Sequence, residues 1–229
     1  MLGWWLTVAA AQDCPPQPEV ALLQVAVEVE QSYLHLDGEA YDRATAAIDA
    51  LLACVRAPLT ARDAVTLHRA FALMAYVRED LPGARRAMAA LHTLQPDWTI
   101  PPELLPREHP LWSVILEAAS VEPRTVALSL VPAWSWSVDG ERFVAADADK
   151  EPERPFTLPA HRAFVLQVFG AEGEVLHTGY HYASVDVPVE HLRALPDPYE
   201  VRRRRRLVLR VTSGVLGGGL LVASASFPR

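Results

Sequence analysis

The fold is decided by the stretch AVTLHRAFALMAYVREDLPGARRAMAALHTLQPDW, which runs from Ala64 to Trp98. Its apolar residues recur at helical intervals on both sides of Asp80-Leu81-Pro82, so it predicts two short amphipathic helices joined at that point. Thr60 is followed three residues later by Asp63 and offers a capping box for the first helix. The spacing of the residues in this stretch is typical of an interaction scaffold and not of a catalytic or metal centre.

The same helical pattern extends on both sides of this stretch. Glu19–Leu36 and Glu39–Val55 carry apolar residues at helical intervals, and Asp37-Gly38 separates them. Pro110–Ala119 predicts a further helix, which would cover the last apolar face of the array. Trp98 and Trp112 fit that covering role better than the lining of a ligand groove, because buried aromatic residues more often belong to a core.

Residues 60–94 resemble a tetratricopeptide repeat. Phe71 and Ala72 match its large and small positions on the first helix, and Ala84 matches the small position where its two helices touch. Pro96 matches the closing proline, whereas His68 stands where the repeat has an aromatic residue.

Close packing explains these matches, because antiparallel helices approach closely only where a small residue faces a large one. Ala72 and Ala84 should let Phe71 and Met88 interlock, and Ala44 takes the place of Ala84 in the preceding pair. The predicted helix-packing residues are therefore Phe71, Ala72, Ala84, Met88 and Ala44.

At Pro123 the periodicity changes from helical to alternating. Short segments rich in Val, Phe, Trp and Tyr are strand candidates, namely Thr125–Leu130, Trp134–Val138, Phe156–Leu158, Ala163–Phe169, Glu174–Tyr180 and Ala183–Val187. Asp139-Gly140 predicts a type I′ hairpin, in which both central residues need positive φ. Residues 124–188 therefore predict a small β-sandwich or barrel.

This β region is similar to the PEGA family of bacterial surface modules. The matching segments are Val138-Asp139-Gly140, Leu158-Pro159-Ala160 and Val165–Val168, whereas Pro132-Ala133-Trp134-Ser135 stands in place of the tetrapeptide that names the family. The resemblance implies a module that serves as a spacer or as a second contact surface.

No catalytic residue, cofactor or metal site is predicted. Asp147 and Asp149 lie in a charged segment that lacks the Gly and Glu of an EF-hand, so it is expected to be a solvated loop. His177 and His181 are four residues apart on a strand, hence about 13 Å apart, and are expected to be two separate surface histidines. The alternative is an enzyme with a site assembled from scattered His and Asp residues.

The N-terminal segment, residues 1–12, reads MLGWWLTVAAAQ and resembles a short signal peptide. The alternative is an apolar tail on a cytoplasmic protein. Cys14 and Cys54 would pair in a disulfide if the chain is exported and would otherwise be two free thiols, and the sequence leaves both open.

The C-terminal part predicts a membrane anchor. Residues 189–206 form a linker that ends in a basic cluster, and residues 207–227 predict a transmembrane helix in which Gly214 and Gly218 allow two helices to approach in a homo-oligomer. The cluster consists of Arg202, Arg203, Arg204, Arg205 and Arg206. Nucleic acid is not expected as a partner, because the net charge is −7 and no aromatic residues interleave the arginines.

The predicted fold class is α+β, with a repeat-like helical domain over residues 18–120, a small β domain over residues 124–188 and a single C-terminal membrane helix. We expect a non-enzymatic, membrane-anchored scaffold of the cell envelope that binds protein partners or envelope polymer through the helical surface. The alternative is a cytoplasmic, tail-anchored adaptor, because a basic cluster beside a membrane helix favours the cytoplasmic side.

Overall fold

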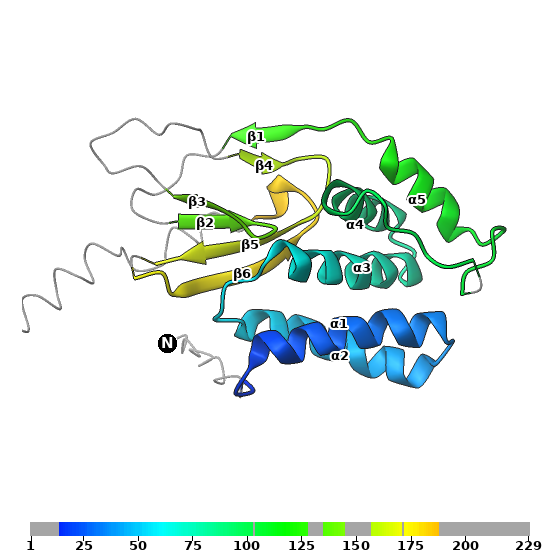
Figure 1. The fold of residues 1–229 in the computed structure, drawn as a ribbon, viewed down its shortest axis with the longest axis horizontal. Coiled ribbons are helices and arrows are strands. Elements are labelled where there is room, and N and C mark those ends of the chain that lie inside the picture. Colours follow the sequence, from blue (N-terminus) through cyan, green and yellow to red (C-terminus); the bar gives the residue numbers. More distant parts are fainter. Residues whose placement is uncertain (1–13, 103, 128–134, 145–156, 171, 188–229) are drawn as a thin grey trace, which may run out of the picture.

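The computed structural model describes residues 14–102, 104–127, 135–144, 157–170 and 172–187. In this part of the chain five helices precede the strands (Figure 1). α1 (Pro18–Leu34) pairs with α2 (Gly38–Cys54), and α3 (Ala61–Val77) pairs with α4 (Leu81–Leu94). α5 (Leu111–Ala119) packs on α4. The five predicted helices are confirmed, with ends that differ by a few residues.

Local capping fixes where these helices begin. Asp37 accepts a hydrogen bond from the Ala40 N–H, and Asp80 accepts one from the Gly83 N–H. Thr60 and Asp63 form the predicted capping box, in which each side chain binds the other residue's backbone N–H. These contacts satisfy backbone donors that the first turn of a helix leaves without a partner.

The strands of the described residues form two antiparallel sheets. The four-stranded sheet has the order β3 (Glu141–Val144), β2 (Ser135–Val138), β5 (Phe164–Phe169) and β6 (Val175–His181). The second sheet pairs β1 (Thr125–Ala127) with β4 (Thr157–Pro159). The α+β class is thus confirmed.

The predicted hairpin at Asp139-Gly140 is present and joins β2 to β3. Asp139 has a φ of 51° and Gly140 a φ of 84°, which is the positive φ that a type I′ turn requires at both positions. The strand candidate at Ala183–Val187 is wrong, because the segment contains a short 3₁₀ helix, η1 (Ser184–Asp186). Asp186 accepts a hydrogen bond from the Ala183 N–H and closes that turn. Residues 128–134 and 145–156 lie outside the described part.

The four-stranded sheet is covered on both faces, which explains why all six residues of β5 are buried. On one face, Val165 and Gln167 meet the helices. On the other, Phe164, Leu166 and Val168 pack with Trp136, Val138 and Leu158. The expected alternation of buried and exposed residues is absent from β5 because neither of its faces meets water.

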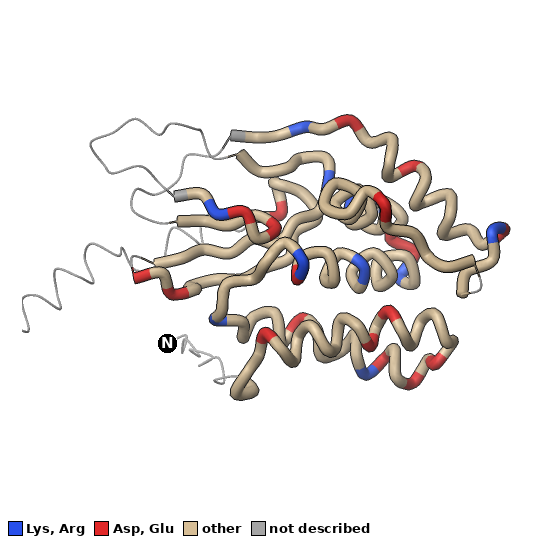
Figure 2. Tube along the Cα trace, viewed as in Figure 1, with Lys and Arg blue, Asp and Glu red and all other residues tan. Residues whose placement is uncertain are grey.

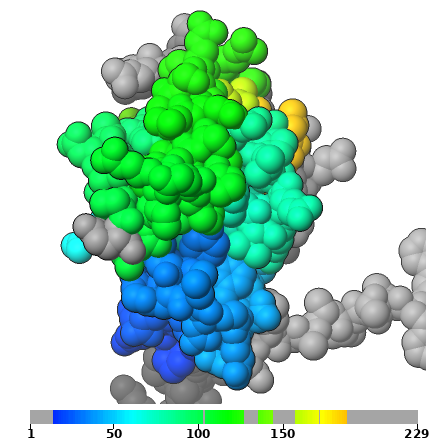
Figure 3. All heavy atoms as spheres, turned by 90° about the vertical axis from the view of Figure 1, so that its right-hand side faces the viewer, coloured from blue at the N-terminus to red at the C-terminus, as the bar shows by residue number. Residues whose placement is uncertain are grey.

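Helix α3 lies at the centre of the molecule. The stretch from Ala70 to Ala75 is buried without interruption, since α1, α4 and the sheet surround it. The helical surface that remains accessible belongs mainly to α1, α2 and α5, and Figure 3 shows α1–α2 beside the segment that contains α5. The α1–α2 hairpin contains several acidic residues (Figure 2), and the exposed ones are Glu28, Asp37, Glu39, Asp42 and Asp49.

Within the described residues, no helix is long and apolar enough to cross a membrane. The predicted signal-like segment, residues 1–12, and the predicted membrane helix, residues 207–227, lie outside the described part of the chain.

Candidate functional site

A buried polar network joins the helices to the four-stranded sheet. Asp139, in the β2–β3 turn, accepts a hydrogen bond of 2.8 Å from the Val165 N–H on β5 through Oδ1. The same oxygen lies 3.0 Å from Nε2 of His68 on α3. Oδ2 of Asp139 pairs with the guanidinium of Arg162. One carboxylate therefore links a helix, a turn and a strand.

His68 is fully buried and bridges two elements of the β part. A carboxylate can only accept, so Nε2 of His68 donates its proton to Asp139. The other ring nitrogen, Nδ1, lies 2.9 Å from the hydroxyl of Tyr180 on β6. The Tyr180 ring also stacks on Phe71, with 3.8 Å between ring centroids and 10° between planes. In the sequence, His68 stands out only as a departure from the tetratricopeptide-repeat pattern. The structure explains this departure, because His68 contacts the sheet.

The charges in this network favour the ionised carboxylate. Burial alone would raise the pKa of Asp139, but the neighbouring His68 and Arg162 outweigh burial and hold that pKa below its ordinary value of 3.8. Burial raises the pKa of Tyr180 well above 10, so the hydroxyl keeps its proton. The network thus contains a buried ion pair whose oxygens are hydrogen-bonded.

A histidine bonded to an aspartate is also an arrangement used in acid–base catalysis. Here the side chains of His68 and Asp139 are 0% and 2% exposed, so neither offers a surface to a substrate. The far side of the imidazole is occupied by the Tyr180 hydroxyl. The geometry therefore suits a structural contact between the helices and the sheet. We call this network of His68, Asp139, Arg162 and Tyr180 the joint.

A second contact attaches the connector between α2 and α3 to the sheet. The Gln167 side chain accepts a hydrogen bond of 2.8 Å from the Leu59 N–H and donates one of 3.0 Å to the Ala57 carbonyl. It also donates to the hydroxyl of Thr178, 3.1 Å away. Gln167 is fully buried, so its amide can bind the connector without competition from water.

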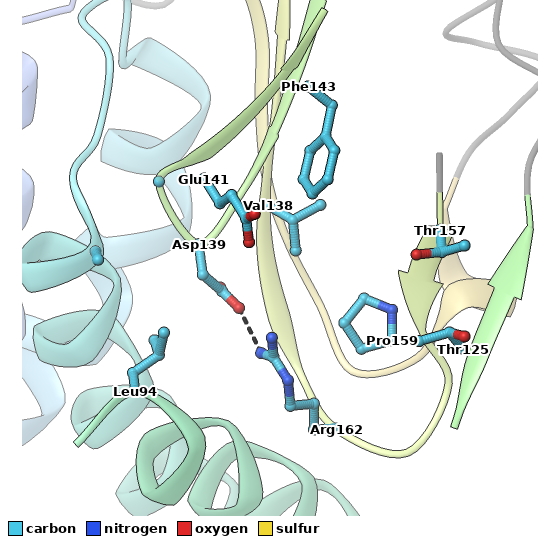
Figure 4. A pocket seen from close by; sticks show the side chains of 11 residues that line it. Leu94, Thr125, Val138, Asp139, Glu141, Phe143, Thr157, Pro159 and Arg162 are labelled. Carbon is cyan, nitrogen blue, oxygen red and sulfur yellow. Dashed lines mark hydrogen bonds and ion pairs between the residues drawn. The ribbon is translucent and has the colours of Figure 1, made fainter. Parts of the chain in front are cut away.

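A pocket of about 470 Å³ lies beside the joint, between the ends of two helices and the strands (Figure 4). Arg162 points across it towards Asp139. Apolar side chains form much of the remaining wall, namely Leu94, Val138, Phe143 and Pro159. Because the guanidinium is already paired with Asp139, the pocket offers little uncompensated charge to an anion.

The predicted helix-packing residues are all buried in the structure. Ala72, Ala84 and Met88 belong to one core cluster, together with α5 residues. Phe71 and Ala44 belong to a second cluster, together with Val165 of the sheet. Phe71 and Met88 thus lie in different clusters, and Phe71 stacks against Tyr180 of β6.

The two cysteines form a disulfide between the segment before α1 and the last residue of α2. Their Cα atoms are 5.6 Å apart, although the sequence separates them by 40 residues. The sequence left this pairing open because spacing alone does not fix the distance between two helix ends.

The predicted membrane-contacting residues lie outside the described part of the chain, namely Arg202, Arg203, Arg204, Arg205, Arg206, Gly214 and Gly218. The charged segment with Asp147 and Asp149 also lies outside it. Among the described residues, no group of three or more His, Cys, Asp and Glu side chains could hold a metal ion.

The expectation of two distant surface histidines on β6 is wrong. The ring centroids of His177 and His181 are 6.4 Å apart, and His181 is only 7% exposed. The rings approach because Gly179, between them, has no side chain to keep them apart.

The joint was not predicted as a site. Asp139 was recognised as a turn residue, and His68 as a departure from the repeat, but nothing in their spacing indicates that they meet across 71 residues. Arg162, Gln167 and Tyr180 carry no local signal, because their roles arise only when the sheet packs on the helices.

Comparison with known proteins found no matching protein-family model, no matching curated protein and no matching solved structure.

Proposed function

We propose that this chain is a non-enzymatic scaffold of a bacterial cell envelope. Its helical part, similar to tetratricopeptide repeats, binds protein partners or envelope polymer, and its PEGA-like β part, of sandwich or barrel type, is a spacer or second contact. Residues 207–227 anchor it to the membrane. The Cys14–Cys54 disulfide carries the proposal, because structural disulfides persist mainly in oxidising compartments outside the cytoplasm.

The rigid joint supports the scaffold role. The helices and the sheet share buried contacts at His68, Asp139 and Gln167, so a partner bound to one part is held in a fixed orientation relative to the other. A protein that only positions other molecules needs such a rigid connection between its parts. The fully buried His68 is also unsuited to catalysis.

The accessible face of the α1–α2 hairpin is the surface to which we assign partner binding. Its exposed charged residues are mainly acidic, namely Glu28, Asp37, Glu39, Asp42 and Asp49 against Arg43 and Arg56 (Figure 2). This imbalance favours a partner with a basic surface, because complementary charge speeds association and selects the partner.

The second candidate is a cytoplasmic, tail-anchored adaptor. The Arg202–Arg206 cluster favours it, because basic residues beside a membrane helix are retained on the cytoplasmic side. In that compartment the two cysteines would be kept reduced.

The two candidates are separated by a reporter that is active only outside the cytoplasm, fused after Pro198. Activity supports the envelope scaffold, and a silent but stable fusion supports the adaptor. Alkylating the thiols in denaturant, after the cells have been quenched with acid, gives an independent result, because Cys54 is buried in the folded chain. The wild-type cysteines should be protected until a reductant is added, whereas Cys54 of the Cys14→Ser variant should react without one.

The binding surface is tested by charge reversal. The variant Glu28→Lys/Asp42→Lys/Asp49→Lys should lose the partners that cross-link to the wild-type chain in membranes. The matched control Glu108→Lys/Glu122→Lys changes exposed acidic residues elsewhere and should keep them. Equal cross-linking by both variants would exclude the α1–α2 face as the binding surface.

A further inference from the structure

The pocket beside the joint has the volume of a small-molecule binding site. Its volume is about 470 Å³, and ligand pockets typically measure about 300–1,000 Å³. The β2–β3 hairpin, the first residue of α3, the last residue of α4 and the β1–β4 sheet surround it (Figure 4). Such pockets combine apolar walls with a few polar groups that orient the ligand. The residues of its walls therefore indicate what it can bind.

Burial separates the floor of the pocket from its rim. Val138 and Pro159 are buried and give the floor an apolar surface. Leu94 and Phe143 are half-buried and form apolar walls above it. Glu141 is exposed and lies at the rim. A bound molecule would therefore place an apolar part on the floor and a polar part beside Glu141.

The side chains that line the pocket have an excess of negative charge. Among the described lining residues, the charged ones are Asp139, Glu141 and Arg162. Arg162 is paired with Asp139, and its Nη1 also donates a hydrogen bond of 3.1 Å to the Ala163 carbonyl. Two acidic residues and one basic residue leave a net charge of −1, which Glu141 carries at the rim. This charge favours a cationic group at the rim.

Neighbouring arginines do not reverse this sign. Successive strand residues point to opposite faces of a sheet. Arg142 therefore lies on the other face of β3 from Glu141, and there it donates hydrogen bonds to the Ser135 hydroxyl. The guanidinium of Arg124 lies 3.9 Å from the carboxylate of Glu122. Neither arginine is among the residues that line the pocket.

The segments that join the strands around the pocket are not basic either. Residues 128–134, between β1 and β2, contain no charged residue. Residues 145–156, between β3 and β4, contain four acidic and two basic residues and so have a net charge of −2, namely Asp147, Asp149, Glu151, Glu153, Lys150 and Arg154. Both segments lie outside the described part of the chain, and their composition favours a cation for any position that they take.

The cost of burying charge decides how a cation would enter. An ammonium group on the apolar floor would lose its hydration, whereas at the rim it keeps water and gains the Glu141 carboxylate. A lysine side chain of a partner protein would enter with its ammonium group first and bring it to Val138 and Pro159. A free amine can enter with its apolar end first, so the geometry favours a small molecule.

We propose that this pocket binds a small amphipathic cation, namely an ammonium group on an aliphatic chain. The chain lies against Val138, Pro159 and Leu94, and the ammonium group pairs with the Glu141 carboxylate at the rim. The site belongs to the β part and does not depend on partner binding by the α1–α2 face, so either proposal can fail alone.

The test is a calorimetric titration of the full chain at neutral pH with hexylammonium, butylammonium, hexanol and hexanoate. Hexylammonium should bind at one saturable site and more tightly than hexanoate, because the two differ in the sign of their charge. Each CH₂ group that reaches the floor leaves water, so affinity should rise from butylammonium to hexylammonium by up to about fourfold per CH₂ group. Nα-acetyl-lysine amide, with the same four-carbon chain as butylammonium, should bind more weakly than butylammonium.

Variants separate the charge at the rim from the shape of the pocket. Glu141→Gln should weaken hexylammonium binding by about fivefold, the upper range for an ion pair near water. Its affinity for uncharged hexanol should stay unchanged, which shows that the pocket is intact. Thr125→Trp places a large side chain at an exposed rim position and should weaken the binding of every ligand. Glu108→Gln, which changes an exposed acidic residue elsewhere, should bind as the wild type does.

Four results would overturn the proposal. The wild type and Thr125→Trp could take up hexylammonium equally, which would mean that the pocket is not the site. Hexanoate could bind as tightly as hexylammonium, or the blocked lysine more tightly than butylammonium, and either result would exclude the ligand class. Glu141→Gln could keep its affinity for hexylammonium or lose hexanol as well, and in both cases Glu141 would not act through the charge of the ligand.

Discussion

Asp139 combines two demands that few residues can meet. It adopts a φ of 51° in the hairpin turn, a conformation that Asp tolerates better than most residues, and its carboxylate is almost fully buried. The carboxylate binds His68, Arg162 and the Val165 N–H. Replacing it should therefore affect the helices as well as the turn.

Asp139→Asn should lower the free energy of unfolding by about 3 kcal/mol, because removing one partner of a buried ion pair leaves the other without compensation. Arg162 would lose its counter-charge, while the shape of residue 139 would be almost unchanged. Urea unfolding measures the effect. Glu141→Gln, in the same hairpin but exposed, is the control and should change stability little. Equal effects of the two substitutions would contradict a central role for Asp139.

The lowered pKa of Asp139 also predicts how stability depends on pH. Because the folded pKa lies below the unfolded value of about 3.8, the ionised carboxylate stabilises the fold fully above that pH. The contribution is lost as the pH falls below 3.8 through the folded pKa. The wild type should thus lose stability more steeply than Asp139→Asn on acidification, and parallel pH profiles would show that Asp139 is not the group responsible.

At the scale of elements, Gly140 sets how closely the β2–β3 hairpin approaches the start of α3. Its φ is 84°, and a Cβ atom there would lie 2.4 Å from the Ala61 nitrogen. Gly140→Ala should therefore lower stability by more than about 1 kcal/mol, because both the conformation and the space exclude a side chain. Gly38→Ala, where nothing lies within 4 Å, should be neutral or slightly stabilising. Identical melting temperatures for the two variants would contradict this packing.

The disulfide should contribute separately to the α1–α2 hairpin. Closing a loop of 40 residues raises the free energy of unfolding by up to about 4 kcal/mol, because it reduces the entropy of the unfolded chain. Adding a reductant should lower the melting temperature of the wild type and leave that of Cys14→Ser unchanged. If the reduced wild type, with two thiols titrated, melts at the original temperature, the disulfide does not stabilise the fold.

The sequence predicted those elements whose signal is local. The five helices and the Asp139-Gly140 turn follow from periodicity, caps and turn residues within a few positions. Strand β3 was implied by the turn but not identified, since Glu141–Val144 is too short and charged to show a clear alternation. Ala183–Val187 has strand-like composition, yet the capping contact from Asp186 favours a turn.

The contacts between elements could not be predicted in the same way. His68 and Asp139 are 71 residues apart, and Leu59 and Gln167 are 108 apart. From its sequence neighbours alone, each of these residues is interpreted only as part of a helix, a turn, a strand or a connector. Their common function appears only when tertiary packing brings them together in a place from which water is excluded.

At the scale of the whole molecule, the helices and the four-stranded sheet share their cores. Val165 and Tyr180 of the sheet pack with α1, α2 and α3, and Ala163 packs with α4 and α5. The stretch between Ala70 and Ala75 is buried because it lies inside this combined core. We therefore expect the helical and β parts to unfold together.

Hydrogen exchange of the wild-type chain in increasing urea tests this most directly. We expect peptides that cover α3 (Ala61–Val77) and β5 (Phe164–Phe169) to lose protection at the same urea concentration. In Asp139→Asn both should lose it together, at a lower concentration. If α3 keeps its protection after β5 has lost its own, the two parts are independent and the joint at Asp139 does not unite them.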